Sequence, residues 1–202
     1  MSSTKVLELI DVHSSYGEIN VLRGINLEIG MGEIVALLGT NGAGKSTLLK
    51  AISGVTEADR GAIILDGRDI THAPPNEIAA LGISQLPGGH AIFPNLTVKE
   101  NIAASRWLSP PQQADNSPPS STKNESGERN EALKLFPEIK ERWHEPAANL
   151  SGGQQQMLGL AMALHSAPRV LMIDERSLGV APAVVERILP VIKQIAANGT
   201  AV

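Results

Sequence analysis

The chain has 202 residues, slightly more than a usual single domain, and its 17 lysines and arginines against 21 acidic residues give a net charge of −4. This balance excludes the basic surface with which proteins bind nucleic acid or an anionic membrane. Hydrophobic residues make up 42% of the chain, enough for a sizeable core, and the lack of cysteine excludes disulfide scaffolds and thiolate metal sites. No apolar run approaches the roughly 18 residues of a membrane span. We therefore expect a cytoplasmic α/β domain.

The first part of the chain predicts an antiparallel layer followed by a buried strand. Residues Lys5–Val12 and Ile25–Ile29 alternate as half-buried strands do, and Ser14–Gly17 is expected to turn the chain. Glu33–Leu38 is apolar without alternation, which is typical of a parallel strand buried on both faces. Farther along, we expect a helix over 45–53, strands over 62–65 and 68–70, a short helix over 76–81 and a strand over 82–86.

The second half predicts a set of helices before the chain returns to a strand. Thr97 and Glu100 form a capping box that opens a helix over 98–107, and Ser109–Glu128 is rich in Ser, Pro, Asn and Gln, which predicts a mobile loop. A second capping box opens a helix that runs to about His165. The last expected elements are a helix over 130–136, a buried strand over 170–173, a helix over 183–197 kinked by Pro190, and a strand that begins at Thr200.

A glycine-rich loop stands between the predicted buried strand and the helix that follows it. Residues Gly39–Thr47 fit the pattern G-x-x-x-x-G-K-[ST] in the context that this pattern requires. Its glycines let backbone N–H groups surround phosphates, and the helix N-terminus adds partial positive charge. Lys45 would reach the β- and γ-phosphates, and the Ser46 hydroxyl would bind Mg²⁺. The predicted nucleotide contacts are Gly39, Asn41, Gly42, Ala43, Gly44, Lys45, Ser46 and Thr47.

Two acidic residues follow the predicted strand Val170–Ile173. Asp174 is placed to hold Mg²⁺ directly or through water, and Glu175 to orient or deprotonate the attacking water. Alone, such a strand is more often one that simply meets solvent. Behind a phosphate loop, the acids favour a metal ligand at Asp174 and a catalytic base at Glu175.

A second anion site is predicted at the start of a later helix. Ser151 and Gln154 form a capping box, which does not explain why Gly152 and Gly153 stand in its first turn, where glycine destabilises a helix. Free N–H groups, a hydroxyl and the helix dipole converge there. Since two such ends of one chain cannot serve the same γ-phosphate, the pattern indicates a dimer that shares nucleotide.

These motifs, taken in order, resemble the ATPase subunits of ATP-binding-cassette (ABC) transporters, over nearly all of the chain from Lys5 to Val202. Three segments resemble more narrowly the smaller ATPase subunit of branched-chain amino acid importers: 92–101, 150–157 and 177–182. The resemblance implies a P-loop NTPase fold with a mixed or parallel core sheet, an N-terminal antiparallel β layer and a helical lobe. It also implies ATP and Mg²⁺ as ligands.

The resemblance further implies an organisation and partners. One ABC ATPase domain would span 1–202, with its core at 1–87 and 166–202 and its helical lobe at 98–165. Two ATPase subunits would pair head to tail, so that the loop around Lys45 of one holds ATP and Ser151–Gln154 of the other closes on the γ-phosphate. Tyr16 matches the aromatic residue that stacks on adenine, although a half-buried turn residue is the alternative. Transmembrane permease subunits would hold the protein at the inner face of the membrane, and nucleic acid would not be a partner.

Several positions depart from the family pattern. Gly88 stands where the family has a Gln or Glu that serves Mg²⁺ and water, and Gln85 is a weak substitute three residues earlier. Arg176 replaces a proline and adds a charge within reach of Glu175, which would weaken that residue as a base. Ala181 stands where many members carry Asp, but this importer branch commonly has Ala there.

The family's switch residue, usually His, follows the strand that begins at Thr200, and none of the five histidines fits that position. We expect from this a cassette that is cut short inside a strand. The alternative hypothesis is therefore a degenerate or regulatory subunit that binds ATP and hydrolyses it poorly. A third class, the soluble ABC ATPases of translation or DNA repair, usually has two cassettes or long coiled coils, and the 202 residues contain neither. A small-molecule P-loop kinase is excluded by Leu150–Gln154.

Overall fold

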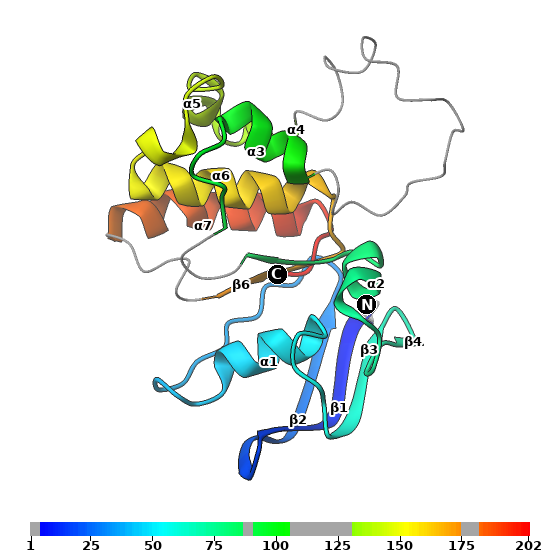
Figure 1. Ribbon diagram of the computed structural model, residues 1–202. Helices are drawn as coiled ribbons and strands as arrows, with labels where there is room; N and C mark the ends of the chain where they lie inside the picture. The colour runs from blue at the N-terminus through cyan, green and yellow to red at the C-terminus, as the bar shows by residue number, and fades with distance from the viewer. Residues whose placement is uncertain (1–4, 87–90, 106–130, 175–181) are drawn as a thin grey trace, which may run out of the picture.

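The computed structural model describes residues 5–86, 91–105, 131–174 and 182–202. Figure 1 shows an antiparallel sheet at one end, a short parallel pair of strands in the middle and a layer of helices at the other end. The predicted loop 109–128 lies outside the described residues. No helix in the described ranges is long and apolar enough to cross a membrane.

The antiparallel sheet contains four strands in the order β2-β1-β3-β4. Strand β1 lies between β2 and β3: its residue Leu9 pairs with Leu27 of β2 on one side and with Ile63 of β3 on the other. Alternate residues of β1 face the core. The bounds are Lys5–Tyr16 for β1, Ile19–Gly30 for β2, Arg60–Leu65 for β3 and Arg68–Asp69 for β4.

The turn expected at Ser14–Gly17 lies farther along than predicted. Strand β1 continues to Tyr16, which pairs with Ile19, so the chain reverses at Gly17 and Glu18. Gly17 has φ +59°, which a tight hairpin turn requires and which glycine adopts at little cost. Ser14 stays in the strand because its buried hydroxyl donates to the carbonyl oxygen of Glu57 at 2.9 Å.

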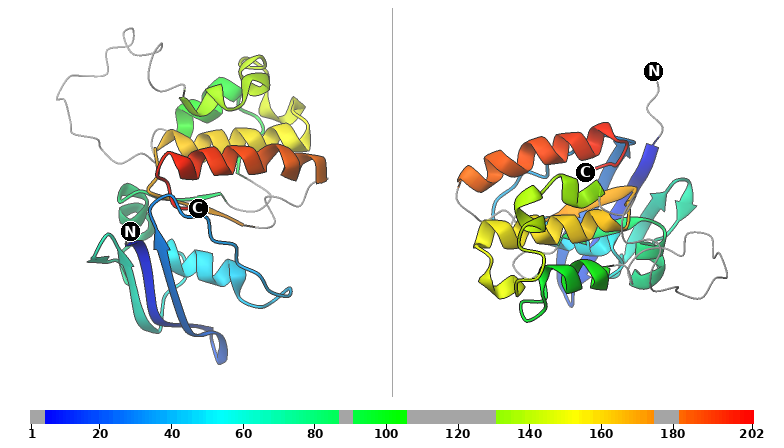
Figure 2. Two further views of the ribbon diagram at one scale, coloured as in Figure 1. Left: turned by 180° about the vertical axis from the view of Figure 1, so that it is seen from behind. Right: turned by 90° about the horizontal axis from the view of Figure 1, so that it is seen from above.

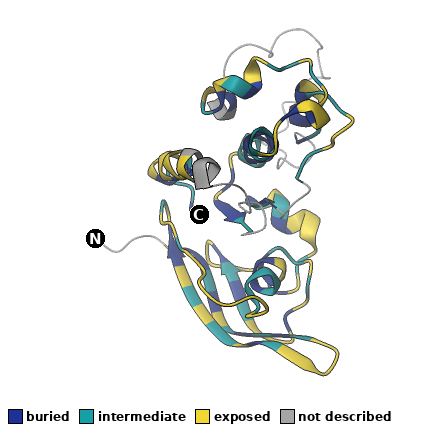
Figure 3. Ribbon diagram, turned by 90° about the vertical axis from the view of Figure 1, so that its left-hand side faces the viewer, coloured by how far each residue is buried: buried dark blue, intermediate teal, exposed yellow. Residues whose placement is uncertain are grey.

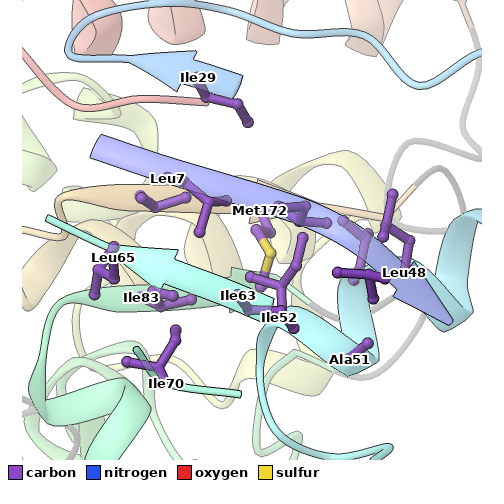
Figure 4. Close-up of a cluster of buried hydrophobic side chains, with 14 of the residues drawn as sticks. Leu7, Ile29, Leu48, Ala51, Ile52, Ile63, Leu65, Ile70, Ile83 and Met172 are labelled. Atoms are coloured by element: carbon purple, nitrogen blue, oxygen red, sulfur yellow. The ribbon is translucent and has the colours of Figure 1, made fainter. Parts of the chain in front are cut away.

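Helix α1 (Lys45–Ile52) packs on this sheet and closes the first hydrophobic cluster. Helix α2 (Pro75–Ala80) adds Ile78 to the same cluster. Figure 4 shows side chains from the sheet, from α1 and from the parallel strands meeting in this core, among them Leu7, Ile29, Leu48, Ala51, Ile52, Ile63, Leu65, Ile70, Ile83 and Met172.

The parallel pair is formed by β5 (Ile83–Leu86) and β6 (Val170–Ile173), in the register Ile83 to Val170. The end of the chain joins this pair, since Ala201 forms a parallel bridge with Val170. Val202 in turn accepts a hydrogen bond from the Val35 amide and donates one to the Glu33 carbonyl, each 2.8 Å long. Residues 33–35 thus run beside Val202.

The prediction of a buried strand over Glu33–Leu38 is wrong for this structure. The segment forms no strand, and Leu38 is 92% exposed. The reason is the lack of a neighbour: within the described chain, Val202 pairs with Glu33 and Val35, and no backbone pairs with residues 36–38. Apolar side chains favour burial between strands, but a strand forms only where an adjacent backbone completes the ladder.

Helices form the remaining layer around a second hydrophobic cluster, and α6 lies at the centre of this layer (Figure 2). Both predicted capping boxes are present, at Thr97 with Glu100 and at Ser151 with Gln154. Figure 3 shows buried residues where α6 faces its neighbours and exposed residues on the outside of α7. The bounds are Val98–Ser105 for α3, Glu131–Lys134 for α4, Pro137–Lys140 for α5, Ala147–Asn149 for the 3-10 helix η2, Gly152–His165 for α6 and Pro182–Ala197 for α7, with Pro190 inside it.

Candidate functional site

The glycine-rich loop runs directly into α1. Gly44 is the N-cap residue, and its φ of +94° lies in the left-handed region that favours glycine. A Cβ atom at Gly44 would also lie 3.2 Å from side-chain atoms of Leu22 and Val21. The Ala43 amide donates to the Thr40 carbonyl at 3.1 Å, which turns the loop tightly before the helix. Both the backbone angle and the lack of space therefore require glycine at position 44.

The Lys45 side chain folds back over the loop. Its Nζ donates to the carbonyl oxygens of Gly39 at 2.7 Å and Thr40 at 3.2 Å. The ammonium is thus held inside the curve of the loop, beside the N-terminus of α1, where two sources of positive potential add. Gly42, with φ +83° and open space within 4 Å of its Cβ position, leaves the outside of the curve clear.

Asp174 lies at the carboxyl end of β6, as predicted. Its amide donates to the Leu86 carbonyl at 3.3 Å, so the ends of β5 and β6 lie side by side. Asp174 and Lys45 line one cleft of about 310 Å³, whose other walls are mainly apolar. The structure therefore brings these two predicted residues of the site together. Glu175 lies outside the described residues.

Asp174 and Ser46, the two predicted metal ligands, would fit Mg²⁺ only together with a phosphate ligand. Among the described residues there is no group of three or more His, Cys, Asp or Glu that could hold a metal alone. One carboxylate from Asp174 and one hydroxyl from Ser46 would leave most of an octahedral shell to phosphate oxygens and water, as is usual for Mg²⁺ in nucleotide sites.

Tyr16 ends strand β1 on the side of α1. Its hydroxyl lies 3.3 Å from Thr56 Oγ1, and the side chain is 49% exposed. The hydrogen bond to Thr56, one to Thr47 and the nearby Lys50 ammonium hold the pKa of Tyr16 below its ordinary value. These hydrogen bonds fix the Tyr16 ring at its hydroxyl end. Because Thr47 is one of the predicted phosphate contacts, they also place the ring next to the predicted nucleotide site. No sequence pattern predicted Thr56 as a partner of Tyr16, because this contact joins residues 40 positions apart.

The start of α6 lies in the helical layer, away from the Lys45 loop along the chain and in space (Figure 1). Here Gln154 N donates to Ser151 Oγ at 3.3 Å, and Ser151 N donates to Gln154 Oε1 at 3.0 Å. Gln155 N donates to the Ser151 carbonyl at 2.8 Å. In the described chain, the amides left without an acceptor in this first turn are those of Gly152 and Gly153.

Glycine at position 152 has no explanation inside the subunit. A Cβ atom there would meet nothing within 4 Å, and its φ is not in the left-handed region. Alanine would favour the helix more than glycine does. Within the described chain, the amides of Gly152 and Gly153 have no acceptor, and the space beside Gly152 is open.

Three departures from the family pattern, at Gly88, Arg176 and Ala181, lie outside the described residues. Gln85 is described: it pairs with Met172, two residues before Asp174. Since side chains alternate along a strand, Gln85 is on the same face of β5 as Ile83, which packs in the first cluster.

Comparison with known proteins agrees with this geometry. The family profile described as ABC transporter matches residues 22–177. The chain is 36% identical over 197 residues to the high-affinity branched-chain amino acid transport ATP-binding protein BraG of Pseudomonas aeruginosa, covering 98% of this chain and 80% of that protein. It is 32% identical over 198 residues to the xylose/arabinose import ATP-binding protein XylG of Sulfolobus acidocaldarius, covering 98% of this chain and 76% of that protein.

The fold is similar as well. The crystal structure of an ATP-binding cassette of an ABC transporter, in its ADP conformation, matches with a TM-score of 0.79 and 27% identity over 98% of this chain and 79% of that chain. The predicted α/β P-loop fold and the predicted resemblance are thereby confirmed. The chain belongs to the ABC transporter family, as a nucleotide-binding ATPase cassette.

Proposed function

We propose that this chain is the ATP-hydrolysing subunit of an ABC importer for branched-chain amino acids. The observation that carries the ATPase role is that Lys45, at the start of α1, and Asp174, directly after β6, line the same cleft. The similarity to BraG over 98% of the chain supports the solute class. XylG, whose name refers to sugars, is also similar over 98% of the chain, which makes a sugar the competing solute.

In this proposal, the chain's own residues divide the work on ATP. The loop amides and the Lys45 ammonium bind the β- and γ-phosphates, and Tyr16 stacks on the adenine. Ser46 and Asp174 would hold Mg²⁺, which supplies charge neutralisation between the phosphates when it is bound. Glu175 orients the attacking water and accepts its proton. One domain, with its core at 1–87 and 166–202 and its lobe at 98–165, carries all of these residues.

A second ATPase subunit completes each site. The free amides of Gly152 and Gly153, with the Ser151 hydroxyl, would contact the γ-phosphate that the partner's Lys45 loop holds. ATP would then close the dimer, and hydrolysis would open it. Transmembrane permease subunits would convert this motion into transport and keep the protein at the inner face of the membrane.

A mixing experiment tests the shared site. Lys45→Ala and Gly152→Ala chains should each hydrolyse ATP at least tenfold more slowly than wild type, because each alters both sites of its homodimer. An equimolar mixture should recover about a quarter of the wild-type rate, since half of the dimers are mixed and each mixed dimer has one intact site. A mixture as inactive as its components would overturn the head-to-tail arrangement.

The proposed base is tested in the same assay. Glu175→Gln should bind ATP as wild type does and lose single-turnover hydrolysis, while turnover that Glu175→Gln leaves unchanged would remove Glu175 from this role. Equally slow ATP hydrolysis by wild type and by Glu175→Gln, with ATP binding intact in both, would favour the degenerate subunit instead.

The solute is tested by uptake. Deleting the gene in its native cell should lower uptake of labelled leucine and leave uptake of labelled xylose unchanged. Normal leucine uptake in the deletion strain would contradict the assignment to branched-chain amino acids.

A further inference from the structure

Asn101, on α3, is a fully buried polar residue, with 0% of its surface exposed. Its Oδ1 accepts a hydrogen bond from the Phe93 amide at 2.7 Å. Its Nδ2 donates to the carbonyl oxygens of Phe93 at 2.9 Å, Leu96 at 3.2 Å and Thr97 at 2.9 Å. One amide side chain therefore holds the loop 93–97 from within.

The loop 93–97 exposes an aromatic side chain while its backbone is fixed. Phe93 is 54% exposed, in a chain of which aromatic residues are only 2%. A loop with no buried anchor would be expected to move freely. The Asn101 contacts instead keep Phe93 in a defined position at the surface.

The same loop is hydrogen-bonded to the segment that leads into α6. The Ala147 amide donates to the Leu96 carbonyl at 2.8 Å, and the Ala148 amide donates to the Pro94 carbonyl at 2.9 Å. Thr97 and Pro146 form an antiparallel bridge. Residues 93–97 and 146–148 thus form one small hydrogen-bonded unit.

Gln155 connects this unit to the first turn of α6. Its Nε2 donates to the carbonyl oxygens of Ala147 and Leu150, both at 3.2 Å. Leu150 precedes Ser151, the N-cap residue of α6. A continuous series of hydrogen bonds therefore runs from Phe93 through Asn101 and residues 94–97 to Ala147, then through Gln155 to the start of α6.

We propose that Asn101 and Gln155 are positioning residues that hold the exposed Phe93 loop and the amino end of α6 as one rigid unit. A displacement of Phe93 by a docked subunit would then move Ser151 and the free amides of Gly152 and Gly153. This consequence rests on the proposed function, because the proposed function assigns the amides of Gly152 and Gly153 to the γ-phosphate that the partner holds. The existence of the rigid unit does not depend on the proposed function.

Amide hydrogen exchange on the nucleotide-free chain tests the unit. Asn101→Asp keeps the shape of the side chain but places a carboxylate against three carbonyl oxygens. We expect at least tenfold faster exchange at Phe93 and Leu96, and also at the distant amides of Ala147 and Leu150. Asn149→Asp, the same change at an exposed position of the same segment, should leave all four amides unchanged. Acceleration confined to 93–97 would overturn the proposal.

A second variant approaches the unit from its other end and avoids a buried charge. Gln155→Met keeps the length of the side chain and removes its donor. It should accelerate exchange at the Phe93 amide at least tenfold while the amides of β1 remain as protected as in wild type. An unchanged Phe93 amide in Gln155→Met would overturn the proposal even where Asn101→Asp fails to fold.

The kinetics of ATP hydrolysis distinguish a positioning role of Gln155 from a role in stability alone. Gln155→Met should lower kcat for ATP hydrolysis at least fivefold and leave KM within twofold, because α6 acts on nucleotide already held by the Lys45 loop. Wild-type chain that binds no ATP would contradict the proposed function while leaving the exchange results to decide on the unit. A matching rise in KM would contradict positioning.

Discussion

At the scale of single residues, the glycines of the two predicted anion sites differ in what the structure requires of them. Gly44 is required by its own subunit, through a φ of +94° and two close side chains. Gly152 meets nothing within 4 Å. The two sequence motifs contain glycine in both places, but in the structure only Gly44 needs glycine for its own backbone and packing, while the position of Gly152 has open space.

Tyr16 offers a residue-scale prediction. Base stacking on an aromatic ring contributes about 1–3 kcal/mol, so Tyr16→Ala should weaken ATP binding about tenfold. Tyr16→Phe should bind within about twofold of wild type, since the ring remains and the bond to Thr56 only orients it. Calorimetry with ATP and with inorganic tripolyphosphate checks this. Equal loss of affinity for both ligands in Tyr16→Ala would contradict stacking on the base.

At the scale of elements, α6 contains a matched pair of glycines. A Cβ atom at Gly159 would lie 2.9 Å from Ala91 Cβ and 3.0 Å from Leu86 Cδ1, so α6 approaches the end of β5 closely there. Gly159→Ala should lower the free energy of unfolding by about 1 kcal/mol, because overpacking outweighs the gain in helix propensity. Gly152→Ala should change it by less than about 0.5 kcal/mol.

Urea unfolding of Gly159→Ala and Gly152→Ala measures this difference in stability. Rates of ATP hydrolysis by the same two variants should rank them in the opposite order. Gly152→Ala should be the more stable and the less active of the two. A Gly152→Ala chain that is strongly destabilised would contradict the view that its glycine serves a ligand.

Helix α3 supplies a prediction about pH. The backbone N–H of Thr97, and then its hydroxyl, donate to Glu100 and hold the pKa of that carboxyl below its ordinary value. A depressed pKa stabilises the fold above the ordinary glutamate pKa of about 4.3, and this contribution is lost as pH falls through the lower folded-state pKa. Between pH 7 and pH 3, the thermal midpoint should therefore fall more in wild type than in Glu100→Gln.

Glu141→Gln is the control for this pH series, since Glu141 is an exposed carboxylate of the same helical layer. It should follow wild type. An equally steep fall for Glu100→Gln would contradict a contribution from the charged cap.

The elements that the sequence predicted correctly are those whose formation depends on residues nearby in the chain. Capping boxes, the phosphate loop with α1, and the acid after β6 depend on nearby residues, so their patterns predicted them. The segment Glu33–Leu38 was mispredicted because its state depends on a neighbouring backbone, and composition does not report which neighbour is present. The links of Tyr16 to Thr56 and of Asn101 to Phe93 escaped prediction for the same reason: they are contacts of the tertiary structure.

At the scale of the whole molecule, two hydrophobic clusters meet at the parallel strands. Ile83 and Met172 belong to the first cluster, while Leu86 and Leu171 belong to the second. Arg169, just before β6, also bonds to Asp66, in the turn between β3 and β4, at 2.5 Å and 2.8 Å. Strand β6, which Asp174 follows directly, is thus held from both sides, and this holds Asp174 in the cleft that Lys45 also lines.

Lys45 and Asp174 are proposed to act on the same bound ATP, and calorimetric titration with ATP, with and without Mg²⁺, measures this. Wild type should bind ATP, Lys45→Ala should abolish binding, and Asp174→Asn should weaken binding only when Mg²⁺ is present. Wild-type affinity in Lys45→Ala, or no binding by the wild-type chain, would exclude a shared ATP site of Lys45 and Asp174.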